Sequence, residues 1–191
     1  SSDNVRLSDH IVSKEEWIDP YKQKIDQELL LLKEKWNQPA FQIQMDHNVE
    51  ISKKCIVYNI RIPEKEFMRF NISNDGSPGT IIALFLARAI DKLNAKSKDP
   101  VVISMCVNQR KALNAPVAHQ SLVGDVRLVY NEKMKSMEFG QQATCFRGMV
   151  ALQSNQDMVL QEVKDYQCFI DELNQCDSEE KKHKLCVEKM N

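Results

Sequence analysis

A cluster of polar side chains directly follows an apolar stretch of the sequence. Residues 101–107, VVISMCV, suit a buried strand, and Asn108, Gln109 and Arg110 come next. A strand that leaves a hydrophobic core has to end in polar groups, so the cluster can simply mark the point where the strand reaches solvent. Alternatively, the strand carries these groups to a site, because functional side chains often stand on loops that a rigid element positions. The sequence alone leaves both interpretations open.

Further positions with chemical potential lie downstream of this cluster. Asp125 follows Gly124 in the stretch SLVGDVRLVY (121–130), where a β-bulge would account for both residues without any chemistry. His119 lies near a predicted strand end. A catalytic His119 would need a partner that orients its ring, and Asp125 is a candidate only by its nearness in sequence. The simpler interpretation is a loop histidine that packs locally or faces water.

The common catalytic and metal-binding motifs are missing. The five glycines are scattered, so there is no phosphate-binding loop, and neither a G-x-S-x-G nor an H-E-x-x-H pattern occurs. The six cysteines form no C-x-x-C pair, and no histidine stands at zinc-ligand spacing from a cysteine pair, which predicts free thiols and no metal site. Free thiols are typical of a reducing compartment, and we therefore expect a cytoplasmic protein. His10 and His183 stand in polar surroundings and are expected on the surface.

The composition argues against several classes of partner. The 191 residues include 26 Lys plus Arg against 27 Asp plus Glu, and this balance is unlike that of a general nucleic-acid binder. No apolar run approaches the ~20 residues that span a bilayer, so we expect no membrane partner. The chain begins with Ser-Ser-Asp rather than Met, and we expect it to be processed or excised from something longer.

Hydrophobic periodicity predicts an α/β protein with a small mixed sheet packed against helices. In the first half, Pro63 ends an alternating strand, and Ser77-Pro78 provides the start of the strongest helix. In the second half, two apolar stripes predict helices, and Asp177 with Glu180 predicts a capping box for the last one. Three strands form a small sheet for this length, so we expect further strands or another chain segment to complete it. The predicted elements are an extended arm over 1–20, helices over 21–36, 64–70 and 77–93, strands over 55–62, from 101 and over 121–130, and helices thereafter.

The order of these segments resembles the C-terminal half of the chloramphenicol-acetyltransferase-like acyltransferases. This group includes the condensation domains of nonribosomal peptide synthetases and related alcohol acetyltransferases. In that family an apolar strand ends in a short polar run with Arg, and a "vGN" element opens the next strand; here Asp125 stands where Asn is common. The resemblance covers about residues 55–191, and more loosely 15–54. The segments that carry it are SPGTIIALFLARAIDKLN (77–94), VVISMCVNQRKAL (101–113), VGDVRLVY (123–130) and the helical tail from residue 137.

This resemblance implies that residues 21–191 form one lobe of a two-lobed enzyme. The family's H-H-x-x-x-D-G motif, whose second His is the general base, has no match here, so an N-terminal lobe outside this chain would supply the base. The whole protein would transfer an acyl group from a thioester to an alcohol or amine. The donor would be CoA or phosphopantetheine on a carrier protein, used as a co-substrate and not bound tightly. The expected tunnel-lining or lobe-joining positions are Asn108, Arg110, Gly124 and Asp125, and Arg110 suits a structural role equally well.

Two rival interpretations remain. The first is a non-catalytic module that binds another protein or a second copy of itself, because surface that the other lobe would cover is otherwise exposed. The second is a self-contained enzyme that uses His119. In the two-lobe interpretation, by contrast, this chain alone is expected to be inactive.

Overall fold

The computed structural model describes residues 14–17, 19, 21, 39–42, 59–93 and 97–190. Nearly all of the helix predicted over 21–36 lies outside these residues, as do His10, Cys55 and the first half of the strand predicted over 55–62. The second half of that strand, Asn59–Ile62, is described and forms no regular element. Its two isoleucines are exposed, Ile60 by 85%.

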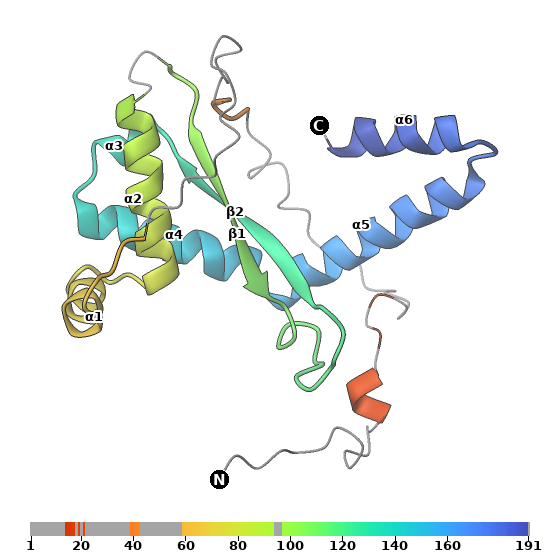
Figure 1. Ribbon diagram of the computed structural model, residues 1–191, viewed down its shortest axis with the longest axis horizontal. Helices are drawn as coiled ribbons and strands as arrows, with labels where there is room; N and C mark the ends of the chain where they lie inside the picture. The colour runs from red at the N-terminus through yellow and green to blue at the C-terminus, as the bar shows by residue number, and fades with distance from the viewer. Residues whose placement is uncertain are drawn as a thin grey trace. The chain divides into compact units, whose positions relative to one another are not determined.

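The described residues form an α/β structure, which confirms the coarse prediction. The sheet contains β1 and β2 alone, and the two strands run antiparallel (Figure 1), so the mixed sheet that we expected is not present in this part of the chain. The chloramphenicol-acetyltransferase-like lobe stays a prediction. In chain order the elements are the 3₁₀ helix η2 (Lys14–Trp17), α1 (Glu64–Ser73), α2 (Pro78–Leu93), β1 (Val101–Asn108), β2 (Val123–Tyr130), α3 (Glu132–Lys135), α4 (Phe139–Gln153), α5 (Gln156–Gln175) and α6 (Glu179–Met190).

The chain divides into two compact units, and each is described by itself. Unit 1 consists of Ser1–Leu32, Cys106–Gly124 and Ser154–Asn191; unit 2 consists of Lys33–Met105 and Asp125–Gln153. The boundary therefore crosses both strands of the hairpin. Unit 2 contains α1 to α4 and most of the hairpin, and unit 1 contains η2, the loop between the strands, α5 and α6.

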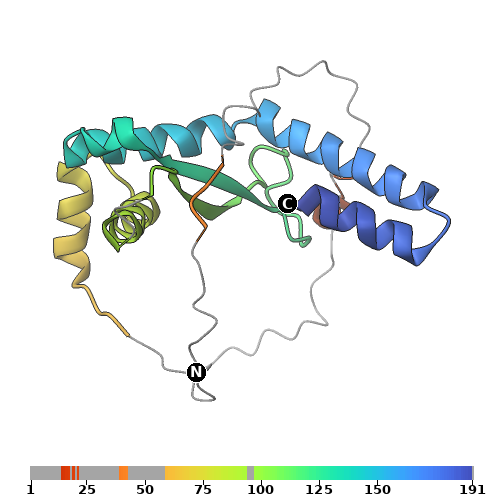
Figure 2. The ribbon, with the colours of Figure 1, turned by 90° about the horizontal axis from the view of Figure 1, so that it is seen from above.

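The start of α2 follows the local sequence signals closely. Thr80 Oγ1 accepts a hydrogen bond from the Ser77 backbone N–H at 3.0 Å, and Ser77 Oγ lies 3.4 Å from the Thr80 N, which is the reciprocal pattern of a capping box. Pro78 takes the first helical position, where its missing N–H costs nothing. The helix packs against α4 (Figure 2). It buries Ile81, Ala83, Leu84 and Ala87, but the rest of its broad apolar face is exposed at Ile82, Phe85 and Leu86.

One face of the hairpin is buried, and the other combines exposed polar side chains with Val102 and the buried Val129. The Gln109 N–H donates to the Leu122 carbonyl at 2.9 Å, so these two residues are opposite each other. In an antiparallel pair, each residue earlier in β1 faces one residue later in β2, which places Ser104 opposite Arg127. Side chains alternate between faces along each strand. The buried face carries Val101, Val126, Leu128 and Tyr130, whereas Ser104, Cys106, Asp125 and Arg127 are exposed. Cys106 falls on this second face and is exposed, although it stands in an apolar stretch of the sequence.

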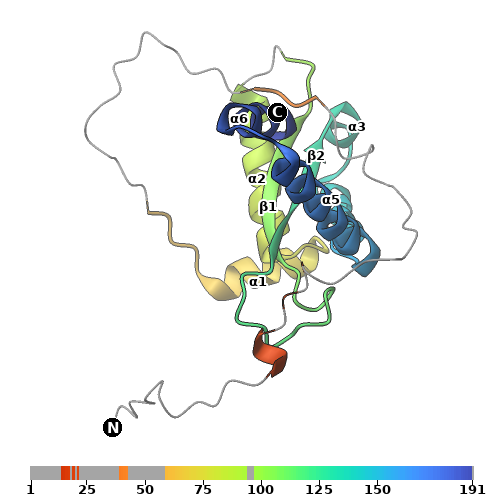
Figure 3. The ribbon, with the colours of Figure 1, turned by 90° about the vertical axis from the view of Figure 1, so that its right-hand side faces the viewer.

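The outer edge of β2 is closed by side chains of α4. The Gln153 amide accepts from the Arg127 N–H and donates to the Arg127 carbonyl, both at 2.9 Å, as a neighbouring strand would. The sulfur of Met149 lies 3.4 Å from the Val129 N. Figure 3 shows the two strands side by side. An edge satisfied in this way offers little to another strand.

Helices near the C-terminus begin at residues that hold specific caps. Ser178, rather than the predicted Asp177, caps α6, because its Oγ accepts from the Lys181 N–H at 3.3 Å. Asp177 instead pairs with Lys181 Nζ at 2.8 Å. The short α3 was not predicted, and its signal is the Asn131 side chain, which accepts from the Met134 N–H at 3.2 Å.

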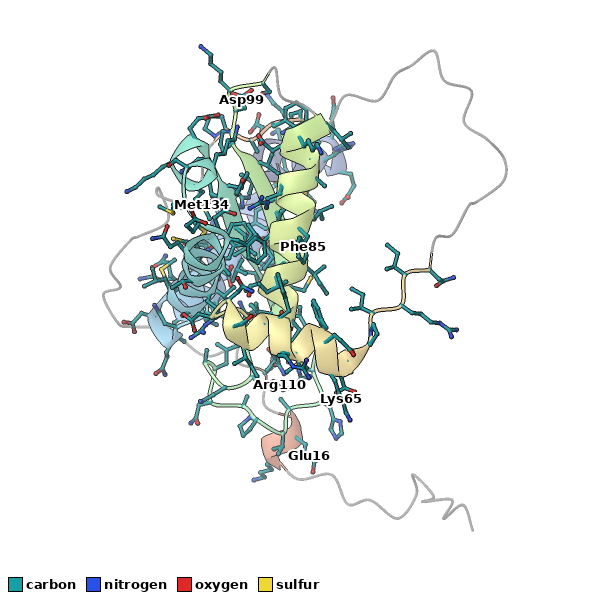
Figure 4. The ribbon with its side chains drawn as sticks, turned by 90° about the vertical axis from the view of Figure 1, so that its left-hand side faces the viewer. Glu16, Lys65, Phe85, Asp99, Arg110 and Met134 are labelled. Atoms are coloured by element: carbon teal, nitrogen blue, oxygen red, sulfur yellow. The ribbon has the colours of Figure 1, made fainter. Side chains whose placement is uncertain are left out.

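Unit 2 contains phenylalanines in two contrasting environments. Phe146 on α4 is fully buried. Phe70, Phe85 and Phe139 instead form a surface cluster, with ring centroids 5.4 to 5.9 Å apart, and Phe85 is 47% exposed (Figure 4). Such a cluster stabilises the contact of three helices while leaving apolar area in water.

We predict that Phe146→Ala destabilises the protein by ~3–5 kcal/mol, because it removes a fully buried ring and leaves a cavity. Phe85→Ala is the matched control and should cost about 1 kcal/mol, since half of its ring is already in water. Urea unfolding followed by circular dichroism would measure both. Equal losses in the two variants would contradict the assignment of Phe146 to the core.

Candidate functional site

The polar end of β1 runs into the hairpin loop, residues 109–122, which belongs to unit 1. The loop folds back on itself: the Leu113 N–H donates to Gln109 O at 3.0 Å and the Ala115 N–H to Arg110 O at 2.9 Å. Asn114 adopts a left-handed backbone with φ of 52°, a conformation that Asn tolerates better than most residues. The polar cluster after the strand is thus the start of an ordered loop, not a frayed end.

Arg110 ties the two sides of the hairpin loop together. Its Nε donates to the Ala118 carbonyl at 3.1 Å and its Nη2 to the Gln120 carbonyl at 2.9 Å. The Asn108 Oδ1 accepts from the Arg110 backbone N–H at 3.0 Å and from Nη1 at 3.3 Å. The planar guanidinium suits this work because its donors point in fixed directions. These contacts favour the structural role among the two that we expected for Arg110.

Gln109 is the buried member of the polar cluster. Its side chain is 4% exposed and donates to the carboxylate of Glu162 on α5. Gly124 lies directly beside this amide, and a Cβ on Gly124 would overlap it. The glycine is therefore needed for close approach, and its backbone φ is not positive. Sequence reasoning missed Glu162, because a glutamate that follows Gln161 on α5 looks like an ordinary solvent-facing residue.

An apolar cluster anchors the hairpin loop to α5. Its loop members are Leu113, Ala115, Ala118 and Leu122, and its α5 members are Val159 and Val163. Burial of this surface, at ~25 cal/mol per Å², is the main force that holds the loop in one shape. The same packing holds Ala118, whose carbonyl accepts from Arg110 Nε.

The carboxylate beside His119 belongs to Glu16, not to Asp125. His119 Nε2 and Glu16 Oε2 lie 2.6 Å apart, and the His119 N–H also donates to the Glu16 carbonyl at 3.0 Å. The His119 side chain is 58% exposed and that of Glu16 14%. Figure 4 shows Glu16 on η2, next to the loop that carries Arg110. A histidine oriented by a carboxylate can act as a general base. Here His119 bonds both the side chain and the backbone of Glu16, so it also attaches η2 to the hairpin loop.

Tyr21 continues the contact that Glu16 begins. Its ring packs edge-on against Tyr166 of α5 with centroids 5.7 Å apart, and its backbone carbonyl accepts from the Gln167 side chain. Burial raises the pKa of the Tyr21 phenol, and the nearby charge of Glu162 raises it further. Tyr21 thus belongs to unit 1 and packs against α5, the helix whose Glu162 also accepts from the Gln109 amide.

Asp125 lies on the polar face of the hairpin within unit 2. Its Oδ2 accepts from the Ser104 hydroxyl at 3.0 Å, and both side chains are exposed. Asn108, Arg110 and Gly124 are brought together in unit 1, and Asp125 is assigned to the other unit. The partner Ser104 had no sequence signal, because a serine in an apolar strand is unremarkable until the register is known.

The site is polar and ordered, and its chemistry is that of hydrogen bonding. Among the residues that the structure describes, no three His, Cys, Asp or Glu side chains gather as metal ligands would. Amide, carboxylate and hydroxyl groups in fixed positions can recognise a polar ligand by hydrogen bonding.

Within the described ranges, no helix is both long and apolar enough to cross a bilayer.

Comparison with known proteins identifies no relative. No family model, curated protein or solved structure matches the chain.

We predict that Gly124→Ala destabilises the protein by ~1–3 kcal/mol, because the new methyl group displaces the buried Gln109 amide from Glu162. Gly148→Ala is the matched control: a Cβ there meets nothing within 4 Å, and in the helix α4 it should stabilise by ~0.5–1 kcal/mol. Thermal or urea unfolding would measure both. In a double-mutant cycle Gln109→Ala should abolish most of the Gly124→Ala penalty, and strict additivity would contradict the close approach.

We predict that Tyr21 makes unit 1 sensitive to alkaline pH. A phenol with a raised folded-state pKa stabilises the fold below the ordinary value of about 10, and this contribution is lost as pH rises through the folded-state pKa. Tyr21→Phe cannot ionise, so its urea midpoint should fall less than that of the wild type between pH 8 and pH ~10.5. Equal falls in both proteins would show that Tyr21 is not responsible.

Proposed function

We propose that the chain is one lobe of a two-lobed, chloramphenicol-acetyltransferase-like acyltransferase. The polar residues at the end of β1 would line part of the tunnel that holds the thioester-bearing arm of the donor. The donor would be CoA or the phosphopantetheine of a carrier protein, and the acceptor an alcohol or an amine. Another lobe would supply the general base, since the sequence has no H-H-x-x-x-D-G motif.

The observation that supports this proposal is the ordering of the polar groups where β1 ends. A pantetheine arm carries amide and hydroxyl groups, and a wall that recognises it needs hydrogen-bonding groups held in fixed positions. Asn108 and Arg110 are held by the hairpin loop, and Gln109 is held against Gly124. A strand that merely reached solvent would need none of these contacts.

The proposal gives different roles to the four expected residues. Arg110 is a positioning residue, because its donors serve the loop carbonyls. Gly124 allows Gln109 to lie close to the strand. Asn108 and Asp125 keep exposed polar side chains, and these are the groups proposed to face the arm.

A second candidate function, a protein-interaction or self-association module, has its own observation in favour. The cluster of Phe70, Phe85 and Phe139 continues into the exposed Ile82 and Leu86 on α2. Contiguous exposed apolar side chains often mark an interaction surface. The same surface is also compatible with contact to another lobe, so it does not by itself distinguish the two functions.

We predict saturable binding of pantetheine to the isolated chain without turnover. Titration followed by ¹⁵N NMR should shift the backbone amides of Asn108, Arg110 and Asp125. Loss of one hydrogen bond in Asp125→Ala should weaken binding roughly fivefold, equivalent to ~1 kcal/mol. Asp157→Ala, which removes an exposed carboxylate at the start of α5, is the matched control and should leave the affinity unchanged. Incubation with acetyl-CoA and an alcohol or amine acceptor should give no product.

Robust acyl transfer by the isolated chain would contradict the two-lobe proposal, and so would the absence of any saturable shift. In the latter case sedimentation velocity distinguishes the rival. A mass that rises with concentration and falls with Phe85→Ser would support the self-association module.

A further inference from the structure

The turn between α1 and α2, residues 74–77, carries the only Asp-Gly pair of the sequence, Asp75-Gly76. Asp75 adopts a left-handed backbone with φ of 52°, a conformation that Asp tolerates better than most residues. The Gly76 N–H donates to the Asn71 carbonyl at 2.9 Å, where α1 ends. The turn is thus closed by hydrogen bonds and has a defined shape.

Packing requires the glycine of this pair. A Cβ at Gly76 would lie 2.5 Å from the side chain of Ile81, which is fully buried on α2. Any other residue at this position would therefore displace Ile81 from a close-packed core. The fold places directly after Asp75 the one residue type that has no side chain to shield its backbone nitrogen.

Side chains of α4 hold both oxygens of the Asp75 carboxylate. Oδ1 pairs with Arg147 Nη1, and Oδ2 accepts from the Thr144 hydroxyl at 3.2 Å. Arg147 Nη1 also donates to the Asp75 backbone carbonyl at 2.9 Å. The Asp75 side chain is nevertheless 61% exposed, so water reaches the same group. These residues all belong to unit 2.

We propose that Asp75 is a modification site at which aspartate converts slowly to isoaspartate, and that Arg147 and Thr144 set the rate. The proposal does not rest on the proposed function. In the first step the Gly76 nitrogen attacks Asp75 Cγ and forms a C–N bond, while one Cγ–O bond breaks. The departing oxygen takes up the Gly76 amide proton and a proton from solvent and leaves as water.

The second step consumes the water that the first step released. Water opens the resulting five-membered succinimide at either of its two carbonyls and returns a proton to solvent. Opening at Cγ restores aspartate, whereas opening at the backbone carbonyl leaves the main chain running through Cβ and Cγ. The conversion therefore needs no oxidant, reductant or other reactant, and it leaves the mass of the protein unchanged.

Each contact of the turn opposes the first step. A carboxylate oxygen held by Arg147 or Thr144 must be released before it can leave, and Cγ must turn towards the Gly76 nitrogen. The bond from Gly76 to the Asn71 carbonyl must break as well, because the nitrogen has to lose its proton. The reaction consequently proceeds only from a locally opened turn, and the contacts from α4 lower the population of that open state.

Isomerisation would loosen a junction of three helices. The isoaspartyl backbone is longer by one carbon, and its carboxylate stands on the other branch, so the bonds to Arg147 and Thr144 are lost. These bonds attach the turn between α1 and α2 to α4. Because α1 and α4 also contribute Phe70 and Phe139 to the aromatic surface cluster, we expect the modified protein to be less stable in this region.

Ageing of the full chain at neutral pH tests the proposal. Peptide mapping separates an isoaspartyl peptide from the aspartyl peptide of equal mass, and fragmentation by electron transfer identifies the residue. Ageing in ¹⁸O-enriched water should add heavy oxygen to the modified peptide, because hydrolysis of the succinimide incorporates an oxygen atom of water. The chain unfolded in guanidinium chloride gives the reference rate, and the folded protein should react more slowly at residue 75.

Variants of α4 measure the control of the rate. Arg147→Ala should raise the rate at Asp75 about fivefold, the factor expected for an exposed charged pair with one backbone hydrogen bond. Thr144→Val should act in the same direction without changing the charge. The matched control is Arg69→Ala, which removes an exposed guanidinium of α1 that does not donate to Asp75 in the described structure, and its rate should equal that of the wild type.

The comparison of these variants decides the outcome, with circular dichroism to show that each keeps its fold. Isoaspartate at residue 75 that forms faster in Arg147→Ala than in Arg69→Ala supports the proposal. Its absence from both the aged wild type and Arg147→Ala would overturn the assignment of a modification site. Equal rates in the wild type and Arg147→Ala, or an equal rise in Arg69→Ala, would reject the control of the rate by α4.

Discussion

A hairpin of two strands has too little surface to be stable alone, so the rest of this structure depends on how β1 and β2 are covered. In unit 2 the buried face presents Val126, Leu128 and Tyr130, while α2 and α4 bury Leu84 and Phe146. Gln153 satisfies the outer edge of β2 with a side-chain amide in place of a strand. Each of these contacts replaces water at a strand that would otherwise be half-solvated.

The buried amide of Gln109 links the strand to α5 in unit 1. A buried amide without a partner costs ~1–3 kcal/mol, so the carboxylate of Glu162 and the absence of a side chain at Gly124 are both required by it. Once Gln109 is fixed, its carbonyl accepts from Leu113 and begins the turn of the hairpin loop. Arg110 then meets the carbonyls of Ala118 and Gln120. A packing constraint at one glycine thus determines where a guanidinium lies.

Elements set by local signals could be predicted from the sequence, whereas their partners could not. The capping residues at Ser77 and the alternation after Gly124 act over a few positions, and α2 and β2 follow them closely. The partner of His119 is Glu16, far away in the sequence, and no spacing pattern encodes such a pair. Periodicity also identified an apolar face on α2 without indicating that Phe85 would stay exposed. Burial depends on which element arrives opposite, and that is a property of the whole fold.

Arg110 illustrates why residue type at a strand end is weak evidence for substrate contact. An arginine after an apolar strand fits an anion site, a tunnel wall or a loop clamp equally well until its donors are followed. Here most of them reach the carbonyls of Ala118 and Gln120 and the side chain of Asn108. Lysine would not be an equivalent replacement, because the guanidinium holds its donors in a rigid planar fork whereas an ammonium group is a single compact charge. Any ligand at this end of β1 would therefore meet surfaces that Arg110 holds in place, with Asn108 as a polar side chain exposed beside them.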